Sequence, residues 1–169
     1  MKNNNKGFSL VELIVVVAIM AVLMAVLVPT LIRNIEKTRV QKDKSAIAEI
    51  HHATEIAIAD EEYANATVSG IGASVKNEII TISELFANKI DDEGEDGDQL
   101  AAEVADAVGA TIKLVSKMKN DCTVKIVYMD TATGEVVIEV TSDASKGGIG
   151  ETFYIDSIGE NKGTWPGLE

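Results

Sequence analysis

Few side chains in this sequence of 169 residues have the types and spacing that catalysis or metal binding requires. Cys122 is the single cysteine, so no disulfide can form within the chain, and we interpret it as a buried or idle thiol. The two histidines, His51 and His52, are adjacent and cannot complete a zinc site with one cysteine. No serine or cysteine stands in a motif with a histidine, and no glycine loop could hold a phosphate. We therefore expect no catalytic residues, no metal ligands and no cofactor.

The acidic stretch DDEGEDGD, at 91–98, contains the one spacing that suggests a metal. Asp92, Asp96 and Glu103 fall on the first, fifth and twelfth positions of an EF-hand loop. Gly94 stands at the third position, where a ligand is needed. We therefore favour a solvated acidic turn, and weak calcium binding at 92–103 is the alternative.

Charge is distributed unevenly along the chain, whose formal net charge is −12. Residues 1–45 hold seven Lys and Arg against three Asp and Glu, a net charge of +4. Residues 46–169 hold eight against twenty-four, a net charge of −16. Because so acidic a region repels phosphate backbones, we expect no nucleic-acid partner for it.

The N-terminal region contains a long apolar segment. Twenty residues without a charge lie between Glu12 and Arg33. A helix of that length spans roughly 30 Å, the thickness of a bilayer core. An ordinary secretory signal has a shorter apolar stretch with a small-residue cleavage site after it, whereas here the small residue, Gly7, comes first. We predict a membrane-spanning helix; a buried core helix is the alternative, but it is hard to bury in so small a protein.

The string KGFSLVE, followed by a long apolar helix, resembles the prepilin signature of type IV pilins and their pseudopilin relatives. The resemblance implies that residues 1–7 are a leader peptide, which a prepilin peptidase cuts between Gly7 and Phe8. It also implies that the new N-terminal residue, Phe8, is N-methylated. Glu12 becomes the fifth residue of the mature chain and Pro29 the twenty-second, where many pilins carry glutamate and proline.

Glu12 needs a partner, because a carboxylate inside a membrane helix costs about 2.5–3.5 kcal/mol at midspan and less near the end. Cleavage would create one, the α-amino group of Phe8, which is cationic near neutral pH. The resemblance implies that Glu12 of one chain pairs with this amine of another and sets the register between subunits. A pair within one chain and an interfacial carboxylate without function are the alternatives. Pro29 lacks an N–H, so we expect a helix kink near residues 23–28.

The element that must carry these residues is one long helix, which we predict from Phe8 to about Glu62. Residues 8–32 form its hydrophobic half, which crosses the membrane or packs in a filament core. Residues 33–62 form an amphipathic half that packs on a head, and the head comprises residues 63–169. His51 and His52 lie in the amphipathic half, where a surface role or a contact with the head is expected.

Within the head, residues 63–80 are interpreted as a connecting loop. Residues 81–84 have capping-box spacing, which predicts a short helix, and a second helix is predicted over 99–108. Apolar alternation around a turn predicts a β-hairpin over 124–141, and a third strand is predicted over 152–155. The expected fold class is α+β, with a small antiparallel sheet packed on the C-terminal half of a long helix.

Three functions follow from the residues and the resemblance. The first is the major pilin of a type IV pilus, whose N-terminal helices pack after leader cleavage and which supports adhesion, motility or aggregation. The second is a minor pilin or a pseudopilin of a secretion or DNA-uptake system. The third, from another class, is a membrane-anchored surface binding domain that never polymerises.

The resemblance also implies the partners and the location. The partners are further copies of the chain, the prepilin peptidase and methyltransferase, the pilus assembly machinery and, before assembly, the membrane. The chain would move from the bacterial cell membrane to an extracellular pilus. Heads without a disulfide occur among pilins of Gram-positive bacteria, which implies that origin.

Overall fold

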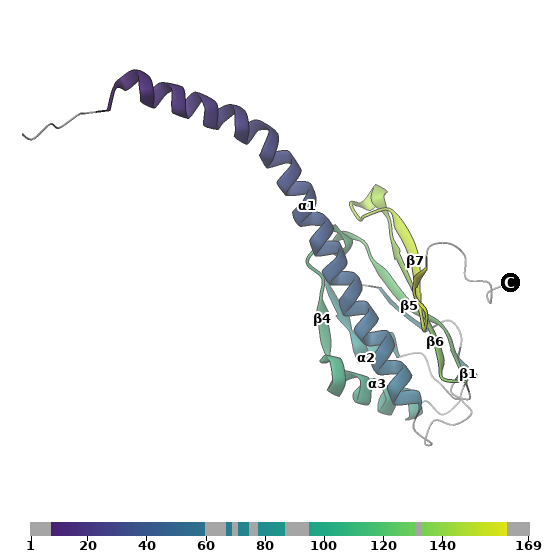
Figure 1. Ribbon diagram of the computed structural model, residues 1–169. Helices are drawn as coiled ribbons and strands as arrows, with labels where there is room; N and C mark the ends of the chain where they lie inside the picture. The colour runs from purple at the N-terminus through teal and green to yellow at the C-terminus, as the bar shows by residue number, and fades with distance from the viewer. Residues whose placement is uncertain are drawn as a thin grey trace, which may run out of the picture. The chain divides into compact units, whose positions relative to one another are not determined.

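The computed structural model describes residues 8–59, 67–68, 71–74, 78–86, 95–130 and 133–161. They belong to two compact units, Met1–Thr38 and Arg39–Glu169. The elements, labelled where there is room in Figure 1, are α1 (Leu10–Ile58), β1 (Thr67–Val68), β2 (Ile71–Ser74), β3 (Ile79–Thr81), α2 (Ile82–Leu85), α3 (Glu95–Val108), β4 (Thr111–Lys113), η2 (Lys117–Asn120), β5 (Thr123–Asp130), β6 (Glu135–Ser142), η3 (Ala144–Lys146), β7 (Glu151–Asp156) and β8 (Gly159–Asn161). The predicted α+β class is confirmed.

The first unit contains the N-terminal part of α1, which is long and apolar enough to cross a membrane. The helix begins at Leu10, two residues after the predicted start, and it continues through Pro29. Directly after Pro29, the Thr30 hydroxyl donates a hydrogen bond to the carbonyl of Val26, one helical turn earlier, at 3.3 Å. Pro29 therefore does not end the helix, and the kink expected near residues 23–28 stays a prediction.

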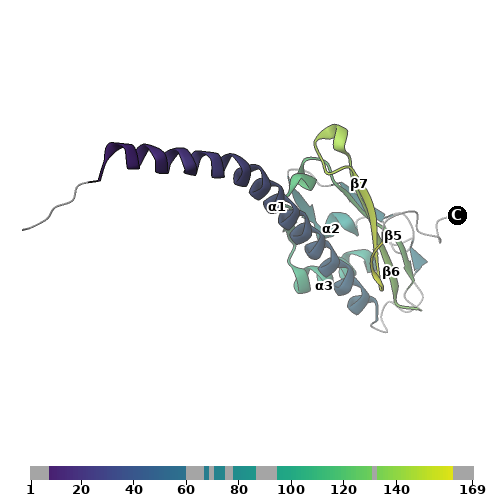
Figure 2. The same ribbon diagram turned by 45° about the horizontal axis from the view of Figure 1, so that its top comes forward.

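The second unit is built on an antiparallel sheet with the order β1-β5-β6-β7-β8, in which β2 also pairs with β5. The predicted hairpin is confirmed as β5 and β6, and the predicted third strand as β7. A separate two-stranded sheet joins β3 to β4. The part of α1 in this unit lies against the main sheet in both views (Figure 1 and Figure 2).

The core forms where α1 meets the sheet, because the apolar side chains of α1 recur at helical spacing on one face. Ile47, Ile50 and Ile58 are buried in one cluster with the inner face of the sheet and with α2 and α3. Burying an isoleucine side chain contributes roughly 1.5–3 kcal/mol. This face holds the C-terminal part of α1 in place.

A β-bulge breaks the alternation in the hairpin. Ile126 pairs with Ile138, but Tyr128 pairs with Val137, so β5 has one extra residue. The bulge places Met129 in the core and leaves Tyr128 partly buried in a small cluster with Val137. A strict period of two along β5 would have put Tyr128, not Met129, on the same face as Ile126.

The interpretation of residues 63–80 as a loop is wrong where the structure describes this segment. Strands β1, β2 and β3 lie within it or begin in it. They are two to four residues long, too short to show a period of two, and pairing with β5 and β4 stabilises them. The remaining residues of the segment lie outside the described residues.

The short helix α2 forms where it was expected, but not through the predicted cap. Thr81 stands at the N-cap position and its side chain makes no capping hydrogen bond. Its backbone is extended because Thr81 is also the last residue of β3, paired with Thr111. Leu85 and Phe86 are buried, as helix packing requires.

The second half of the acidic stretch contributes the start of α3, so the predicted turn is wrong for residues 95–98. The helix begins at Glu95 and includes Asp96 and Glu103, so the described residues form neither the solvated turn nor a calcium loop. Acidic residues are favourable in the first turn of a helix, where its dipole is positive. Residues 91–94 lie outside the described residues. Gly109 ends the helix with φ +94°, and its N–H donates to the Ala105 carbonyl at 2.8 Å.

Candidate functional site

The start of α1 places three residues of the N-terminal motif side by side. Phe8 is 85% exposed, and Ser9 directly precedes the first helical residue. The Ser9 N–H donates a hydrogen bond to Glu12 Oε2 at 2.9 Å, and the Leu13 N–H donates to the Ser9 carbonyl at 3.3 Å. Gly7 and the rest of the predicted leader lie outside the described residues, so leader cleavage stays a prediction.

This geometry gives Glu12 a role that our sequence reasoning missed. Ser9 and Glu12 occupy the first and last positions of a capping box, in which the glutamate accepts from the N-cap N–H. The signal was present in the sequence as Ser-x-x-Glu before an apolar run. Glu12 remains exposed, and a carboxylate has about four acceptor positions. It can therefore cap its own helix and still accept an amine from elsewhere.

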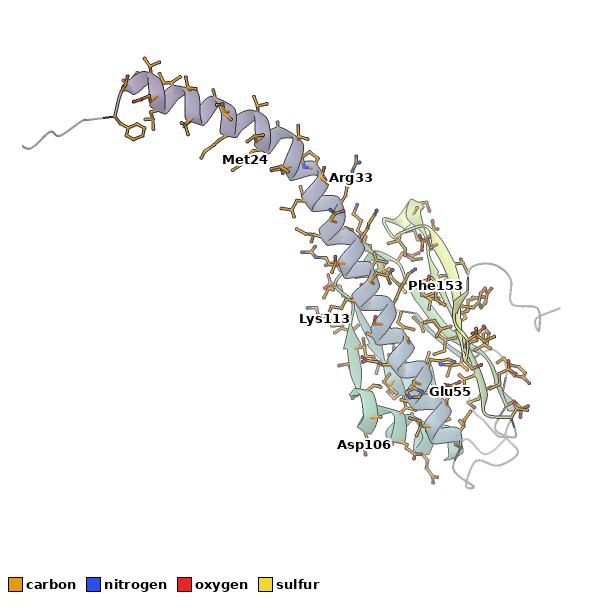
Figure 3. All side chains as sticks on the ribbon, in the orientation of Figure 1. Met24, Arg33, Glu55, Asp106, Lys113 and Phe153 are labelled. Carbon is orange, nitrogen blue, oxygen red and sulfur yellow. The ribbon has the colours of Figure 1, made fainter. Side chains whose placement is uncertain are left out.

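The rest of the site is the apolar surface of the first unit. None of its most apolar stretch is buried within the chain, and Figure 3 shows its side chains as sticks. Exposed apolar surface of this extent marks a contact with lipid or with other protein chains. The exposed large side chains from the start of the helix to the end of this stretch are Leu10, Val11, Leu13, Ile14, Val15, Val16, Val17, Ile19, Met20, Val22, Leu23, Met24, Val26, Leu27, Val28, Leu31 and Ile32.

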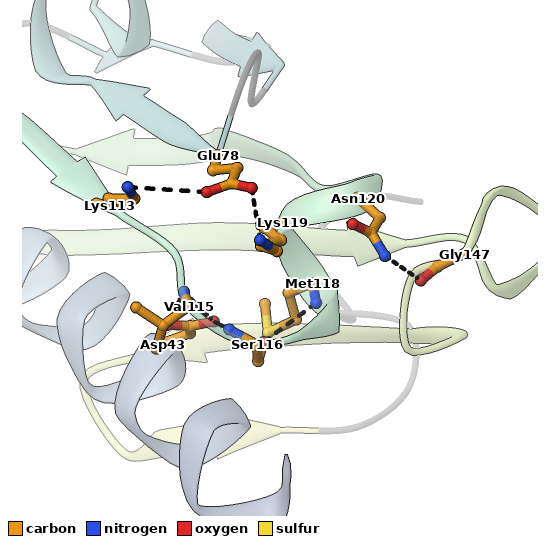
Figure 4. Close-up of polar contacts among 9 residues, drawn as sticks. All are labelled: Asp43, Glu78, Lys113, Val115, Ser116, Met118, Lys119, Asn120 and Gly147. Atoms are coloured by element: carbon orange, nitrogen blue, oxygen red, sulfur yellow. Dashed lines mark hydrogen bonds and ion pairs between the residues drawn. The ribbon is translucent and has the colours of Figure 1, made fainter.

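In the second unit, a buried carboxylate links α1 by hydrogen bonds to the segment that follows β4. This residue is Asp43, which is 2% exposed and lies beside Val115 and Ser116, the residues just after β4 (Figure 4). Its Oδ1 accepts the Val115 N–H at 2.9 Å, and its Oδ2 accepts the Ser116 N–H at 2.8 Å. The Val115 N–H also lies 3.2 Å from Oδ2. Two backbone donors that helix and sheet leave without a partner are thereby satisfied.

Lys44, the next residue, forms a second polar link from α1 to the sheet. Its buried ammonium lies 2.7 Å from Glu160 Oε1 and 3.3 Å from Glu151 Oε2. It also lies 4.3 Å from the centre of the Phe153 ring, within the range of a cation–π contact. Two carboxylates and one aromatic ring therefore compensate for the burial of this charge.

The two histidines have different positions. His51 is buried, and its Nε2 lies 2.8 Å from the Val136 carbonyl of β6, so Nε2 carries the proton that is donated. His52 is exposed. The expectation of a head contact or a surface position is confirmed for both. Within the described ranges, no three His, Cys, Asp or Glu side chains gather as a metal site.

Cys122 is confirmed as a buried thiol, and we expect it to react with a disulfide reagent at pH 8 only after unfolding. Burial, and then the carboxylates of Asp121 and Asp43, raise the pKa of Cys122 from 9.0 to about 12. The reactive thiolate is therefore scarce in the folded chain. Since the folded pKa is raised, the stability gained from the neutral thiol is complete below pH 9 and declines from about pH 9 to 12. Rapid labelling of the folded protein at pH 8 would contradict this assignment.

Comparison with known proteins identifies the N-terminal site. The family model described as the prokaryotic N-terminal methylation motif matches residues 2–28. Type II secretion system core protein G of Dickeya chrysanthemi is 36% identical over 76 residues, which cover 45% of this chain and 50% of that protein. The chain thus spans about half the length of this relative, and no solved structure matches it significantly. The chain therefore carries the prokaryotic N-terminal methylation motif ahead of a long helix and an α+β head, which is the arrangement expected of a type IV pilin-like protein.

Proposed function

We propose that this chain is the major subunit of a type IV pilus. The observation that carries the proposal is the pairing of the methylation motif with an N-terminal helix whose apolar side chains are exposed on every side. The second unit has its own core and needs no such surface for its stability. The exposed apolar helix is therefore available for other copies.

The mechanism follows from the chemistry of the motif. A prepilin peptidase hydrolyses the peptide bond between Gly7 and Phe8, which releases the leader and leaves an α-amino group on Phe8. Methylation of this nitrogen keeps it cationic. The amine then meets the exposed carboxylate of Glu12 in a neighbouring copy, inside a bundle of apolar helices where charge attraction is strong. In this proposal the chain is a substrate of the processing enzyme and does no catalysis itself.

Filament growth exchanges lipid contacts for contacts with further copies. In a membrane the apolar helix is surrounded by acyl chains, and in a filament it is surrounded by equivalent helices. Contacts that join two different surfaces generate an open helical polymer when the rotation between copies does not close into a ring. The chain would thus start in the cell membrane and end in an extracellular fibre.

A pseudopilin of a secretion system is the second candidate, and one observation favours it. The similar protein from Dickeya chrysanthemi is a core protein of the type II secretion system. A pseudopilin would share the cleavage, the methylation and the helix packing, so the N-terminal chemistry does not separate the two candidates. They differ in the assembly that the chain enters.

Mass spectrometry of the N-terminus, combined with electron microscopy of sheared filaments, tests the proposal. We expect a mature chain that begins with N-methylated Phe8, present as the main component of surface fibres. Deletion of the gene should remove these fibres and leave protein secretion unchanged. Loss of secretion with intact surface fibres would favour the pseudopilin. An intact Met1 on a chain that forms no fibre would contradict both and would favour an anchored binding domain.

A further inference from the structure

A short segment at the end of the apolar stretch of α1 has two sides of different chemistry. Residues 31–37, with the sequence LIRNIEK, are helical throughout and belong to the first unit. Arg33 and Lys37 are exposed, lie one helical turn apart and share one side of the helix. The opposite side, by the spacing of about 3.6 residues per turn, carries the exposed apolar side chains Leu31, Ile32 and Ile35.

The remaining charge of this segment is Glu36. It lies at the border between the two sides, is partly buried and makes an interaction of its own. The exposed charges of residues 31–37 are therefore both cations, and Arg33 is labelled in Figure 3. A helical segment with cations on one side and apolar side chains on the other is typical of a membrane surface.

The position of this segment along α1 places it at the boundary of a bilayer. Arg33 is the first charge after the uncharged residues that follow Glu12. The helix from Glu12 to Arg33 rises about 30 Å at about 1.5 Å per residue, which matches a hydrocarbon core of about 30 Å. When this part of α1 spans the membrane, Arg33 and Lys37 therefore reach the headgroup layer, where lipid phosphates are negatively charged.

We propose that, before assembly, residues 31–37 lie tilted at the membrane surface, with the apolar side toward the acyl chains and Arg33 and Lys37 on the phosphates of anionic lipids. Opposite sides of a helix are about 10–12 Å apart, so a tilt of about 20°, the average for membrane helices, separates them in depth by about 4 Å. Each side then meets the surroundings that suit it. The inference rests on the membrane-inserted chain from which the proposed function begins, and it applies equally to a pseudopilin.

Anionic lipid is favoured as the partner over the acidic surface of a second copy. Residues 46–169 have a net charge of −16, so every copy does offer carboxylates. Lipid headgroups, however, lie at the depth of these two cations in every inserted chain, whereas a second copy has to be recruited. A cation near an anionic bilayer surface favours binding by about fivefold.

The lipid preference of the full chain tests the cationic side. The chain is reconstituted without assembly proteins in phosphatidylcholine vesicles that contain a spin-labelled lipid, either phosphatidylglycerol or phosphatidylcholine. Electron paramagnetic resonance then measures how much of each lipid contacts the protein. We expect phosphatidylglycerol to be preferred roughly twofold or more, because only part of the lipid around the helix touches the cations. Arg33→Gln with Lys37→Gln should abolish this preference. Lys113→Gln with Lys125→Gln, the matched control, removes the same charge from exposed positions of β4 and β5 and should retain it.

The depth of two positions in the bilayer tests the tilt. Spin labels are attached to Arg33→Cys and to Ile35→Cys, each in a chain with Cys122→Ala, and their depth is measured from collisions with oxygen and with a water-soluble nickel complex. In an upright helix the label at position 33 is deeper by about 3 Å, because it is nearer the span. The proposed tilt offsets the two sides by more than this rise, so we expect the label at position 35 to be the deeper one.

The outcomes separate this inference from the proposed function. Equal contact of both lipids with the unmodified chain, or an unchanged preference after Arg33→Gln with Lys37→Gln, would overturn the lipid contact. A deeper label at position 33 would overturn the tilt. If the double Gln variant instead loses energy transfer between labelled copies and keeps its lipid preference, the cations face a second copy and the inference is wrong. Methylated Phe8 and surface fibres are measured independently of these results. Circular dichroism of each variant establishes that the head is folded.

Discussion

A chain with Glu12→Ala is expected to be processed, inserted in the membrane and folded in its head, and yet to lose filament assembly roughly tenfold or more. Glu12 lies in the first unit, outside the core that stabilises the second unit, so the substitution leaves that core intact. In the proposed filament, however, its loss leaves the cationic amine of a neighbouring Phe8 without a partner in an apolar bundle. An uncompensated buried charge costs several kcal/mol. Filament yield by electron microscopy and N-terminal mass spectrometry provide the two measurements.

Glu12→Gln separates the two roles that the structure gives this residue. A glutamine can still accept the hydrogen bond from the Ser9 N–H, since capping boxes use either side chain. It cannot neutralise an amine. If charge pairing is decisive, the Gln and Ala variants fail equally; if capping is decisive, the Gln variant assembles like the unmodified chain. Loss of the cap alone costs only about 0.5–2 kcal/mol. Normal filament yield from both variants would refute an assembly role for Glu12.

Asp43→Ala is expected to lower the stability of the second unit by about 3–5 kcal/mol. The substitution leaves the N–H group of Ser116, which is buried, and that of Val115, which is partly buried, without their acceptor. Each buried donor that loses its partner costs about 1–3 kcal/mol, and the lost side chain also leaves a cavity. Because domains have only about 5–15 kcal/mol of stability in total, the effect is large. The thermal midpoint should fall by on the order of 10 °C.

The thermal unfolding of the detergent-solubilised full chain, followed by circular dichroism, measures this effect. Asp106→Ala is the matched control, because Asp106 is an exposed aspartate of α3 outside its first turn and surface substitutions change stability by about 0.5 kcal/mol or less. Asp43→Asn retains one acceptor oxygen but turns an amide donor toward a backbone donor, so it should also destabilise. An unchanged midpoint for Asp43→Ala would show that the link between α1 and the head is not held by this carboxylate.

Local chemistry determined much of this protein, and those parts were readable in the sequence. The N-terminal motif, the apolar half of α1 and the β5–β6 hairpin each depend on residues close together along the chain. Helical or alternating spacing and the order of a few side chains are enough to specify them. The same holds for the end of α3 at Gly109, where only a left-handed backbone closes the helix.

Only the tertiary structure decided the features that depend on residues far apart in the chain. Strands β1 to β3 are too short to be stable alone, and they form because β5 and β4 provide hydrogen-bonding edges. In the sequence, Asp43 and Lys44 are two charges in a polar stretch of helix, where exposed side chains would be expected. Their burial depends on partners more than seventy residues away, which no local pattern reveals.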